Sequence, residues 1–317
     1  MTAERKILLL LGATAVGKTA AACALYDALG GADAVALISV DATMVYRGFD
    51  IGAAKPTPAE LARHPHALID VADPAQPYTV ATFVEAADAV VAAALDAGRL
   101  PVLVGGSMLY ARRFLEGLAT LPSASDELRE TLADEWRERG GEALHAELAQ
   151  ADPQAAARIH PNNPQRLLRA LEVLRGTGRP ISELWAERAG QGAPARHDAA
   201  VHTVALAADD RAELHARIEA RFQAMLAAGF LDEVRGLQAR GDLHPALPAV
   251  RAVGYRQAWQ HLNGELTHDR FVADALTATR RLAKRQLTWL RQWPDARALS
   301  WRLSPAQIAE EIVKQLT

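Results

Sequence analysis

The sequence is poor in cysteine, in aromatic residues and in long apolar runs. Cys23 is the single cysteine among 317 residues, so disulfide frameworks and cysteine-based zinc sites are excluded. No apolar run reaches the roughly 18 residues that a membrane-spanning helix needs. We therefore expect a cytoplasmic protein that works in a reducing compartment without a membrane partner. Nothing in the sequence indicates an obligate dimer, and a monomer is expected.

The remaining composition is that of an ordinary globular protein. The chain is 50% hydrophobic and 23% charged, which supplies enough apolar material for a sizeable core. Its length corresponds to about two domains at roughly 150 residues each. The formal net charge is −3, and taken alone this value argues against nucleic-acid binding, because such domains tend to be basic.

The charges are distributed unevenly along the chain. Residues 126–152 carry nine acids against three arginines, whereas residues 158–180 carry five arginines and one acid, Glu172. Residues 275–294 carry five basic residues, no acid, and both Trp289 and Trp293. Basic segments with interleaved aromatics suit phosphate contacts and base stacking. A single segment of this kind is more typical of a solvated helix whose tryptophans lie in the core.

Short apolar runs alternate with helical patterns in the first 120 residues. Such alternation predicts βαβ units and a parallel sheet, which binds ligands at the carboxyl ends of its strands. The fold class we expect is α/β, a P-loop NTPase-like parallel sheet flanked by helices with a helical insertion domain. The predicted strands are residues 6–11 (KILLLL), 34–40 (AVALISV), 67–71 (ALIDV) and 100–104 (LPVLV), and the predicted helices are residues 19–29 and 80–97.

The pattern changes near residue 121. The next 80 or so residues are helical and strongly charged until an apolar strand returns at residues 201–206 (VHTVAL). We therefore predict a P-loop α/β catalytic domain of residues 1–120 and 200–317, interrupted by a helical insertion domain of residues 121–199. The expected linker is residues 190–194 (GQGAP), and two further helices are predicted at residues 211–237 and 274–293.

A phosphate-binding loop follows the first predicted strand. It matches G-x-x-x-x-G-K-[ST] in full, with a strand before it and a helix after it. Its backbone amides and the helix N-terminus would face an anion, Lys18 would bridge phosphate oxygens, and the Thr19 hydroxyl would hold Mg²⁺. The motif predicts a di- or triphosphate ligand without naming it. The loop consists of Gly12, Ala13, Thr14, Ala15, Val16, Gly17, Lys18 and Thr19.

Two motifs that often accompany this loop are missing. GTPases carry N-K-x-D for guanine, but none of the asparagines, Asn162, Asn163 and Asn263, precedes a lysine. No clear apolar run ends in Asp-Glu, so there is no obvious Walker B motif. A motor ATPase is therefore weakly supported.

Asp41 follows the second predicted strand directly. In a parallel sheet this position lies at the carboxyl edge, near the phosphate loop. A carboxylate there could serve as a general base or a metal ligand, and it could equally cap a following turn. The position alone does not decide between these roles.

From this point the chain resembles the tRNA dimethylallyltransferase (tRNA isopentenyltransferase) family. The resemblance is carried by motifs that occur in family order over essentially the whole chain. They are GATAVGKT at residues 12–19, ISVDATMVYRGFDIGAAKP at 38–56, VGGSMLY at 104–110, QRLLR at 165–169, RAVGYR at 251–256 and KRQLTWLR at 284–291. The departures, among them Ala13, Val16, Ala42 and Ala53, remove no charged group.

The resemblance implies an activity and roles for individual residues. The family transfers a dimethylallyl group from dimethylallyl diphosphate to N6 of the adenosine 3′ of the anticodon, position 37. Asp41 would be the general base, while Lys18, Thr19 and Mg²⁺ would stabilise the leaving diphosphate. Arg221, with Arg217 one turn before it, is the best candidate for a further cation on the diphosphate, although both could lie on a solvated helix face. Ser107 would contact the RNA or its base.

The resemblance also implies a tRNA surface that binds the anticodon stem-loop. An adenosine stacked in a loop must be splayed out to reach the donor, and the family does this from a channel beside its helical insertion. Because both basic segments coincide with family motifs, they favour RNA contacts, and the acidic segment is expected to face away from RNA. The predicted tRNA-binding residues are Asp41, Ala42, Thr43, Met44, Ser107, Gln165, Arg166, Leu167, Leu168, Arg169, Arg251, Ala252, Val253, Gly254, Tyr255, Arg256, Lys284, Arg285, Gln286, Leu287, Thr288, Trp289, Leu290 and Arg291.

Two other functions are compatible with parts of the sequence. A P-loop kinase for a small metabolite or nucleotide would use the arginine-rich insertion as its lid. A nucleotide-switched RNA-binding protein would need no catalytic base.

Overall fold

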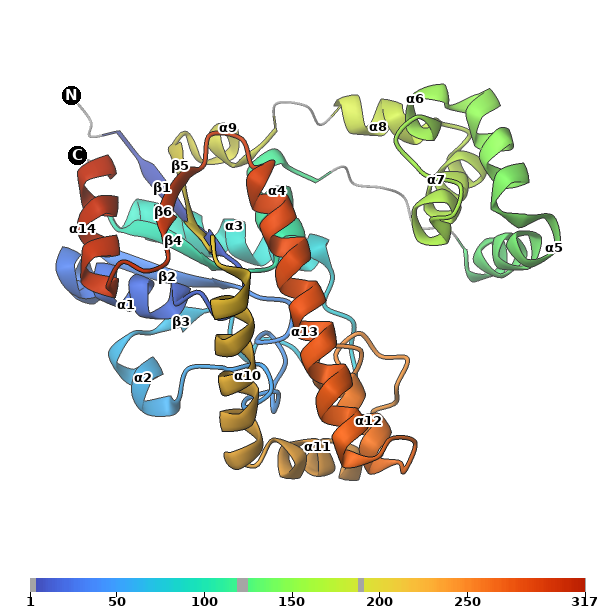
Figure 1. Cartoon of the computed structure of the whole chain (residues 1–317). Helices are drawn as coiled ribbons and strands as arrows, with labels where there is room; N and C mark the ends of the chain where they lie inside the picture. The colour runs from blue at the N-terminus through green and yellow to red at the C-terminus, as the bar shows by residue number, and fades with distance from the viewer. Residues whose placement is uncertain (1–3, 119–124, 188–190, 317) are drawn as a thin grey trace. The chain divides into compact units, whose positions relative to one another are not determined.

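The computed structural model describes residues 4–118, 125–187 and 191–316, and it divides into two compact units (Figure 1). Unit 1 comprises residues 1–115 and 193–317, and unit 2 comprises residues 116–192. The predicted boundary at residues 120 and 121 lies outside the described residues, as does Gly190 of the predicted linker.

Unit 1 is built on a parallel sheet, which confirms the predicted fold class. The strand order is β3-β2-β4-β1-β5-β6, and every pairing between these strands is parallel. The inner strands are apolar on both faces, as a sheet covered by helices on both sides requires. The strands are β1 (Lys6–Gly12), β2 (Val35–Val40), β3 (His66–Ala67), β4 (Leu100–Gly105), β5 (Ala200–Ala207) and β6 (Arg297–Ser300).

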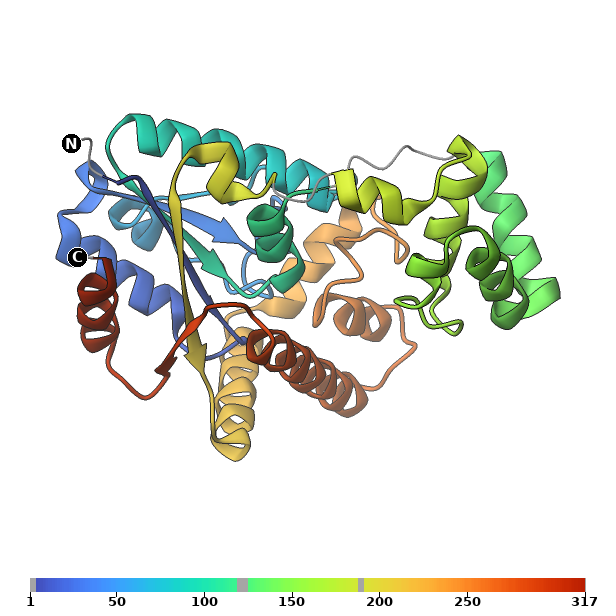
Figure 2. The ribbon, with the colours of Figure 1, turned by 90° about the horizontal axis from the view of Figure 1, so that it is seen from above.

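Helices cover both faces of this sheet. The first helix, α1 (Lys18–Leu29), and the last, α14 (Pro305–Leu316), pack together on one face, and α3 (Val80–Asp96) lies on the other (Figure 2). The long helices α10 (Arg211–Ala227) and α13 (His268–Arg291) pack against each other. The remaining helices of unit 1 are the 3-10 turn η1 (Gly31–Asp33), α2 (Pro58–Arg63), α4 (Met108–Glu116), α9 (Ala193–His197), α11 (Phe230–Ala239) and α12 (Tyr255–Leu262).

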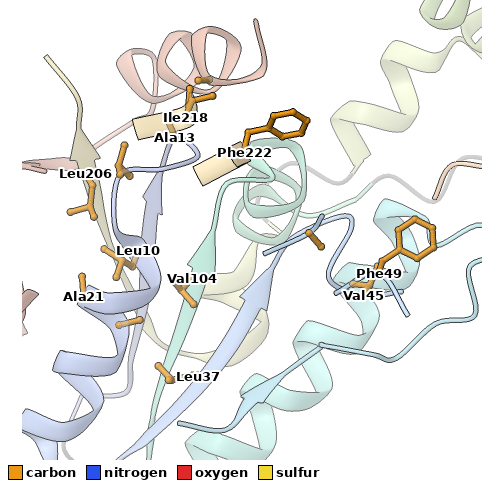
Figure 3. Packing of buried hydrophobic residues seen from close by; sticks show 14 of the residues in the cluster. Leu10, Ala13, Ala21, Leu37, Val45, Phe49, Val104, Leu206, Ile218 and Phe222 are labelled. Atoms are coloured by element: carbon orange, nitrogen blue, oxygen red, sulfur yellow. The ribbon is translucent and has the colours of Figure 1, made fainter. Parts of the chain in front are cut away.

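A single apolar cluster extends from the sheet to α10–α13. Leu10, Leu37 and Val104 on neighbouring strands belong to it together with Ile218 and Phe222 of α10, and Figure 3 shows part of this packing. The cluster therefore fixes the position of α10 relative to the carboxyl edge of the sheet.

Unit 2 consists of helices around a core of its own. Its elements are α5 (Asp126–Ala151), α6 (Pro153–Ala156), α7 (Pro164–Thr177) and α8 (Ile181–Glu187). Leucines of α5 and α7 form the core, including Leu132, Leu144 and Leu167, all fully buried. Gly140, with φ of 75°, breaks the course of α5.

The predicted helix over residues 211–237 is wrong as a single element. It ends at Ala227, and a new helix begins at Phe230. Gly229 adopts φ of 95°, a left-handed conformation that glycine reaches without steric cost and that ends a helix. The apolar spacing continues through this break because α10 and α11 both bury residues in the same cluster.

The predicted strand at residues 67–71 is also largely wrong. Only Ala67 of that run is in a strand, since β3 is two residues long. Leu68 and Asp70 adopt φ of 64° and 57°, which no strand tolerates. Further along the chain, the last predicted helix begins earlier, at His268, and β6, α12 and α14 were not predicted, although α12 and α14 are amphipathic in sequence.

Candidate active site

The phosphate loop connects β1 to α1 and has the backbone shape of an anion nest. Ala15 and Gly17 adopt φ of 67° and 89°, so successive amides turn toward the inside of the loop. Lys18 Nζ donates a hydrogen bond to the carbonyl oxygen of Ala13 at 2.7 Å. The lysine is thus held over the loop, where an anion would replace the carbonyl as its partner.

Two other strand ends meet this loop because β2, β4 and β1 are adjacent. Asp41 follows β2, and its Oδ1 accepts hydrogen bonds from the amides of Thr43 at 2.8 Å and Met44 at 3.1 Å. Ser107 follows β4, and its Oγ accepts the amide hydrogen of Ala42 at 3.0 Å. Asp41 therefore caps the turn after it, and this cap fixes the orientation of its carboxylate. No ion pair joins Asp41 to any residue of the described chain within 4 Å.

These groups line one cleft of about 560 Å³ in unit 1. A cavity of this size is in the range of small-molecule and cofactor sites. The predicted site residues that the cleft brings together are Thr14, Ala15, Lys18, Thr19, Asp41, Ala42, Thr43, Met44, Ser107, Arg221, Arg251, Ala252, Val253, Gly254, Arg285, Gln286 and Trp289.

The charged groups of the cleft influence one another. Burial and, to a smaller extent, the positive charge of Arg221 lower the pKa of Lys18 to about 8, against the opposing effect of the negative charge of Asp41. Loss of water around its guanidinium lowers the pKa of Arg221, again against the effect of Asp41. Lys18 and Arg221 therefore place two positive charges near one carboxylate, with the excess of positive charge that a diphosphate requires, and Arg251 and Arg285 also line the cleft.

An apolar wall completes the cleft, and sequence reasoning did not find it. It includes Ile218, Phe222 and Met225 of α10, Phe230 of α11, and Leu282 of α13. The periodicity of these residues is that of an ordinary amphipathic helix, so the sequence does not distinguish a cleft wall from a core. The arrangement can hold an anion at one end and an apolar group beside it.

Several predicted tRNA-binding residues have little exposed surface. Leu167 is fully buried in the core of unit 2, and Tyr255 and Gln286 are 1% and 7% exposed in unit 1. Gly254 is also buried. In each motif, the residues that stay exposed and free for RNA are the neighbours, such as Arg166, Arg256 and Arg285.

Tyr255 instead holds one wall of the cleft. Its hydroxyl donates to Glu233 Oε1 at 2.6 Å and accepts the amide hydrogen of Ala53 at 3.0 Å. Glu233 also accepts the amides of Asp50, Ile51 and Gly52, at 3.0, 2.6 and 3.2 Å. Two helices thereby fix the loop whose Gly52 and Ala53 line the cleft.

Arg217 does not line the cleft, unlike Arg221 one turn later. Its Nη2 donates to Glu213 at 2.9 Å, and its guanidinium lies 4.3 Å from the centre of the Trp301 ring. The predicted contact of Arg217 with the diphosphate is therefore not supported, because these two partners hold the side chain elsewhere.

The exposed side of α13 carries basic residues without acidic partners. Arg281, Lys284 and Arg285 make no ion pair with the described residues within 4 Å, and with Thr288 and Trp289 they line a second cavity of about 330 Å³. Trp289 is 36% exposed and also lines the cleft, whereas Trp293 is 6% exposed. Of the two tryptophans, only Trp289 is available for stacking.

The arginines of unit 2 are arranged differently, because acidic residues of the same unit pair with some of them. Arg175 forms ion pairs with Glu135 at 2.7 Å and Glu147 at 2.6 Å, both on the acidic helix α5. The hydrogen bond from Arg175, with a smaller contribution from Arg139, holds the pKa of Glu135 below its usual value. The acidic segment thus neutralises part of the basic one.

The fold and the cleft together define a P-loop-like α/β protein whose cleft places basic side chains beside a carboxylate. The chain belongs to the IPP transferase family, whose model matches residues 44–293. A tRNA dimethylallyltransferase of Chromohalobacter salexigens is 52% identical over 309 residues, covering 98% of this chain and 96% of the relative.

Solved structures agree with this assignment. The tRNA isopentenylpyrophosphate transferase of Bacillus halodurans has a TM-score of 0.69 at 33% identity, covering 99% of this chain and 96% of the other. A eukaryotic dimethylallyltransferase, crystallised acting on tRNA, has a TM-score of 0.79 at 22% identity, covering 98% and 79%; at that identity it supports the fold alone. Across the described ranges, no helix has the length and apolarity to cross a membrane.

Proposed function

We propose that this protein transfers a dimethylallyl group from dimethylallyl diphosphate to N6 of the adenosine 3′ of the anticodon, position 37, in tRNA. The observation that carries the proposal is the cleft itself, in which a carboxylate without an ion-pair partner in the described chain faces two cations and an apolar wall. A kinase is less well supported, because the relatives of this chain are named as prenyltransferases acting on tRNA.

Asp41 acts as the general base in the proposed reaction. The N6 amine attacks the allylic C1 carbon, the bond from C1 to the diphosphate oxygen breaks, and the N6 proton passes to the Asp41 carboxylate. Hydrogen bonds from Thr43 and Met44 occupy Oδ1, so the other carboxylate oxygen is the one that accepts the proton. Ser107 fixes the amide of Ala42 and thereby positions this turn.

The leaving diphosphate is stabilised at the phosphate loop, beside Asp41. Lys18, Arg221 and the amides of the phosphate loop supply positive charge where negative charge develops as the bond breaks. Excluding water from this region strengthens each of these interactions. The apolar wall formed by Phe222 and Met225 holds the apolar chain of the dimethylallyl group, next to its reacting carbon C1.

The residues present fit a magnesium ion that is bound largely through substrate. No group of three or more His, Cys, Asp or Glu in the described chain could form a protein cage for a metal. Magnesium commonly uses one or two protein oxygens together with phosphate oxygens and water. Thr19 would provide its hydroxyl, with phosphate oxygens and water as the other ligands, and the ion would neutralise charge on the diphosphate.

The tRNA is proposed to bind with its anticodon stem-loop on unit 1 near α13. Arg285, Arg251 and the exposed ring of Trp289 line the cleft into which the splayed adenosine would enter. Arg166 of unit 2 is exposed and would add a phosphate contact. Cytoplasmic location and a monomeric state stay predictions of this proposal.

Mass measurement of the RNA product tests the proposed function. Purified protein, Mg²⁺, dimethylallyl diphosphate and unmodified tRNA should yield tRNA heavier by one dimethylallyl group at the adenosine 3′ of the anticodon. Transfer of phosphate from ATP to a small acceptor, without this mass shift, would contradict the proposal in favour of a kinase.

The Asp41→Asn variant tests the proton transfer. Asparagine keeps the size of the side chain and the hydrogen bonds from Thr43 and Met44, but it cannot accept the N6 proton. We expect product formation to fall by about 10²–10⁴-fold, the usual contribution of a general base, while tRNA affinity stays within about twofold of the wild type. The control is Asp269→Asn, an exposed aspartate at the first residues of α13. A nucleotide-switched binding protein would instead retain its cellular function after the Asp41 change.

A further inference from the structure

Gln286 is the one side chain of the KRQLTWLR motif that reaches the phosphate loop. It lies on α13 and is 7% exposed. Its Oε1 accepts the amide hydrogen of Thr14 at 2.9 Å, and its Nε2 donates to the carbonyl oxygen of Gly106 at 2.9 Å. One amide group therefore joins α13 to the phosphate loop after β1 and to the turn after β4.

The turn after β4 has a glycine where Gln286 approaches it. A Cβ atom at Gly106 would lie 2.6 Å from Gln286 Nε2 and 3.3 Å from the carbonyl oxygen of Gly12. The first distance is shorter than real Cβ contacts allow, so a side chain at this position would displace the amide. The two hydrogen bonds of Gln286 therefore require that residue 106 has no side chain.

The same helix carries the groups proposed to contact RNA within about one and a half turns of Gln286. Arg285 and Trp289 line the cleft, while Arg281, Lys284 and Thr288 line the outer cavity. A helix transmits a shift or rotation along its length because its backbone hydrogen bonds keep it rigid. A displacement of α13 by bound RNA would therefore move Gln286, and with it the amide of Thr14 in the diphosphate loop.

We infer that Gln286 is a positioning residue that couples binding of the tRNA to binding of the donor diphosphate. The inference rests on the proposed function, because it takes α13 as an RNA-binding helix and the loop as the diphosphate site. Through Gln286, RNA on α13 holds the phosphate loop in its binding shape, and diphosphate in the loop holds α13 in place. Such coupling is reciprocal, so each ligand raises the affinity for the other by the same factor.

Calorimetry with non-reacting ligands measures this coupling directly. The affinity of the full-length protein for inorganic diphosphate with Mg²⁺ is determined with and without saturating anticodon stem-loop RNA, and the ratio of the two affinities is the coupling factor. We expect about fivefold or more for the wild type, the lower end of typical coupling between sites. In Gln286→Met, which keeps the side-chain length and removes both hydrogen bonds, the factor should fall to within about twofold of one.

A second variant approaches the same contact from the other side. Gly106→Ala leaves α13 unchanged and displaces the Gln286 amide, so it should lower the coupling factor as Gln286→Met does. Gln223→Met, an exposed glutamine on α10, is the control and should keep the wild-type factor.

Other results of these measurements would contradict either the coupling or the proposed function. A wild-type factor of one, or an unchanged factor in Gln286→Met while both affinities fall, would overturn the coupling and leave Gln286 a purely structural residue. Absence of RNA binding to the wild-type protein would overturn the proposed function as well. RNA and diphosphate binding with no effect of either variant would overturn this inference alone.

Discussion

Lys18 combines two demands that oppose each other. It must be charged to hold a diphosphate, yet burial and the charge of Arg221 lower its pKa to about 8. A bound diphosphate favours the protonated lysine, so it raises this pKa again. The contribution of Lys18 to diphosphate affinity is therefore fully present below pH 8 and decreases as the pH rises through about 8.

This balance predicts a pH dependence of donor binding. The affinity for diphosphate with Mg²⁺ should fall by up to about tenfold per pH unit above 8, because binding then takes up one proton. Calorimetry between pH 7 and pH 10 checks the slope. The Lys18→Met variant serves as the control, since it should bind more weakly and lose this part of the slope. An identical slope in the variant would show that another group is responsible.

At the scale of elements, the ends of neighbouring segments are held together by few polar contacts. The loop that contains Gly52 and Ala53 depends on Glu233 of α11 and Tyr255 of α12. The carboxylate beside it and the burial of its ring raise the pKa of the Tyr255 hydroxyl, so it stays protonated and donates. This wall of the cleft is therefore held by hydrogen bonds as well as by apolar packing.

The Tyr255→Phe variant should destabilise the protein and loosen the cleft. It leaves the amide of Ala53 without its partner and removes one hydrogen bond from Glu233, a loss of about 1–3 kcal/mol in the free energy of unfolding. Denaturant unfolding measures this change, and the KM for the donor should rise. Tyr26→Phe is the matched control, because Tyr26 lies in the same core but its hydroxyl has no hydrogen bond among the described residues. Equal effects of the two changes would contradict the role of the Tyr255 hydroxyl.

How well each strand or helix could be predicted depends on its burial and on its turn residues. Strands β1, β2, β4 and β5 are buried on both faces, so continuous apolar runs indicated them within about two residues. The break at Gly229 was missed because an isolated glycine is tolerated inside a helix pattern. β6 was missed because it is a short edge strand with only Leu299 buried.

The candidate site was predictable where a strand end fixed it. Asp41, Lys18 and Ser107 each follow a parallel strand, so topology alone brings them to one edge. The apolar wall with Phe222 and the bonds of Gln286 could not be predicted, because they depend on how helices distant in sequence pack over that edge. Sequence motifs also included buried residues such as Tyr255 whose contribution is structural.

At the scale of the whole molecule, the net charge of −3 does not show which basic residues are free of ion pairs and which are not. Arg175 is committed to Glu135 and Glu147 inside unit 2, whereas Arg281 and Lys284 on α13 have no acidic partner within the described chain. The attraction for RNA phosphates depends on the basic groups without an acidic partner more than on the total number of basic groups.

RNA affinity should consequently depend on salt mainly through α13. On single-stranded RNA each lost phosphate contact lowers the slope of log affinity against log salt by roughly 0.7. The double variant Arg281→Ala and Lys284→Ala should thus reduce the slope by up to about 1.4. Filter binding over a salt series provides the measurement. Arg302→Ala, whose arginine pairs with Asp209 and Glu213, should leave the slope unchanged; a flat wild-type response would contradict the assignment of this face.

The position of unit 2 within the chain bears on the order of folding. β1 pairs with β4, which precedes unit 2 in the sequence, and with β5, which follows it. The sheet therefore lacks β5 and β6 until the ribosome has made the residues beyond 192, whereas unit 2 is one continuous segment with its own core. Local contacts form faster than distant ones, so unit 2 can fold during synthesis while one side of β1 is still unpaired because β5 has not been made. That open strand side is the part of the nascent chain most exposed to incorrect pairing.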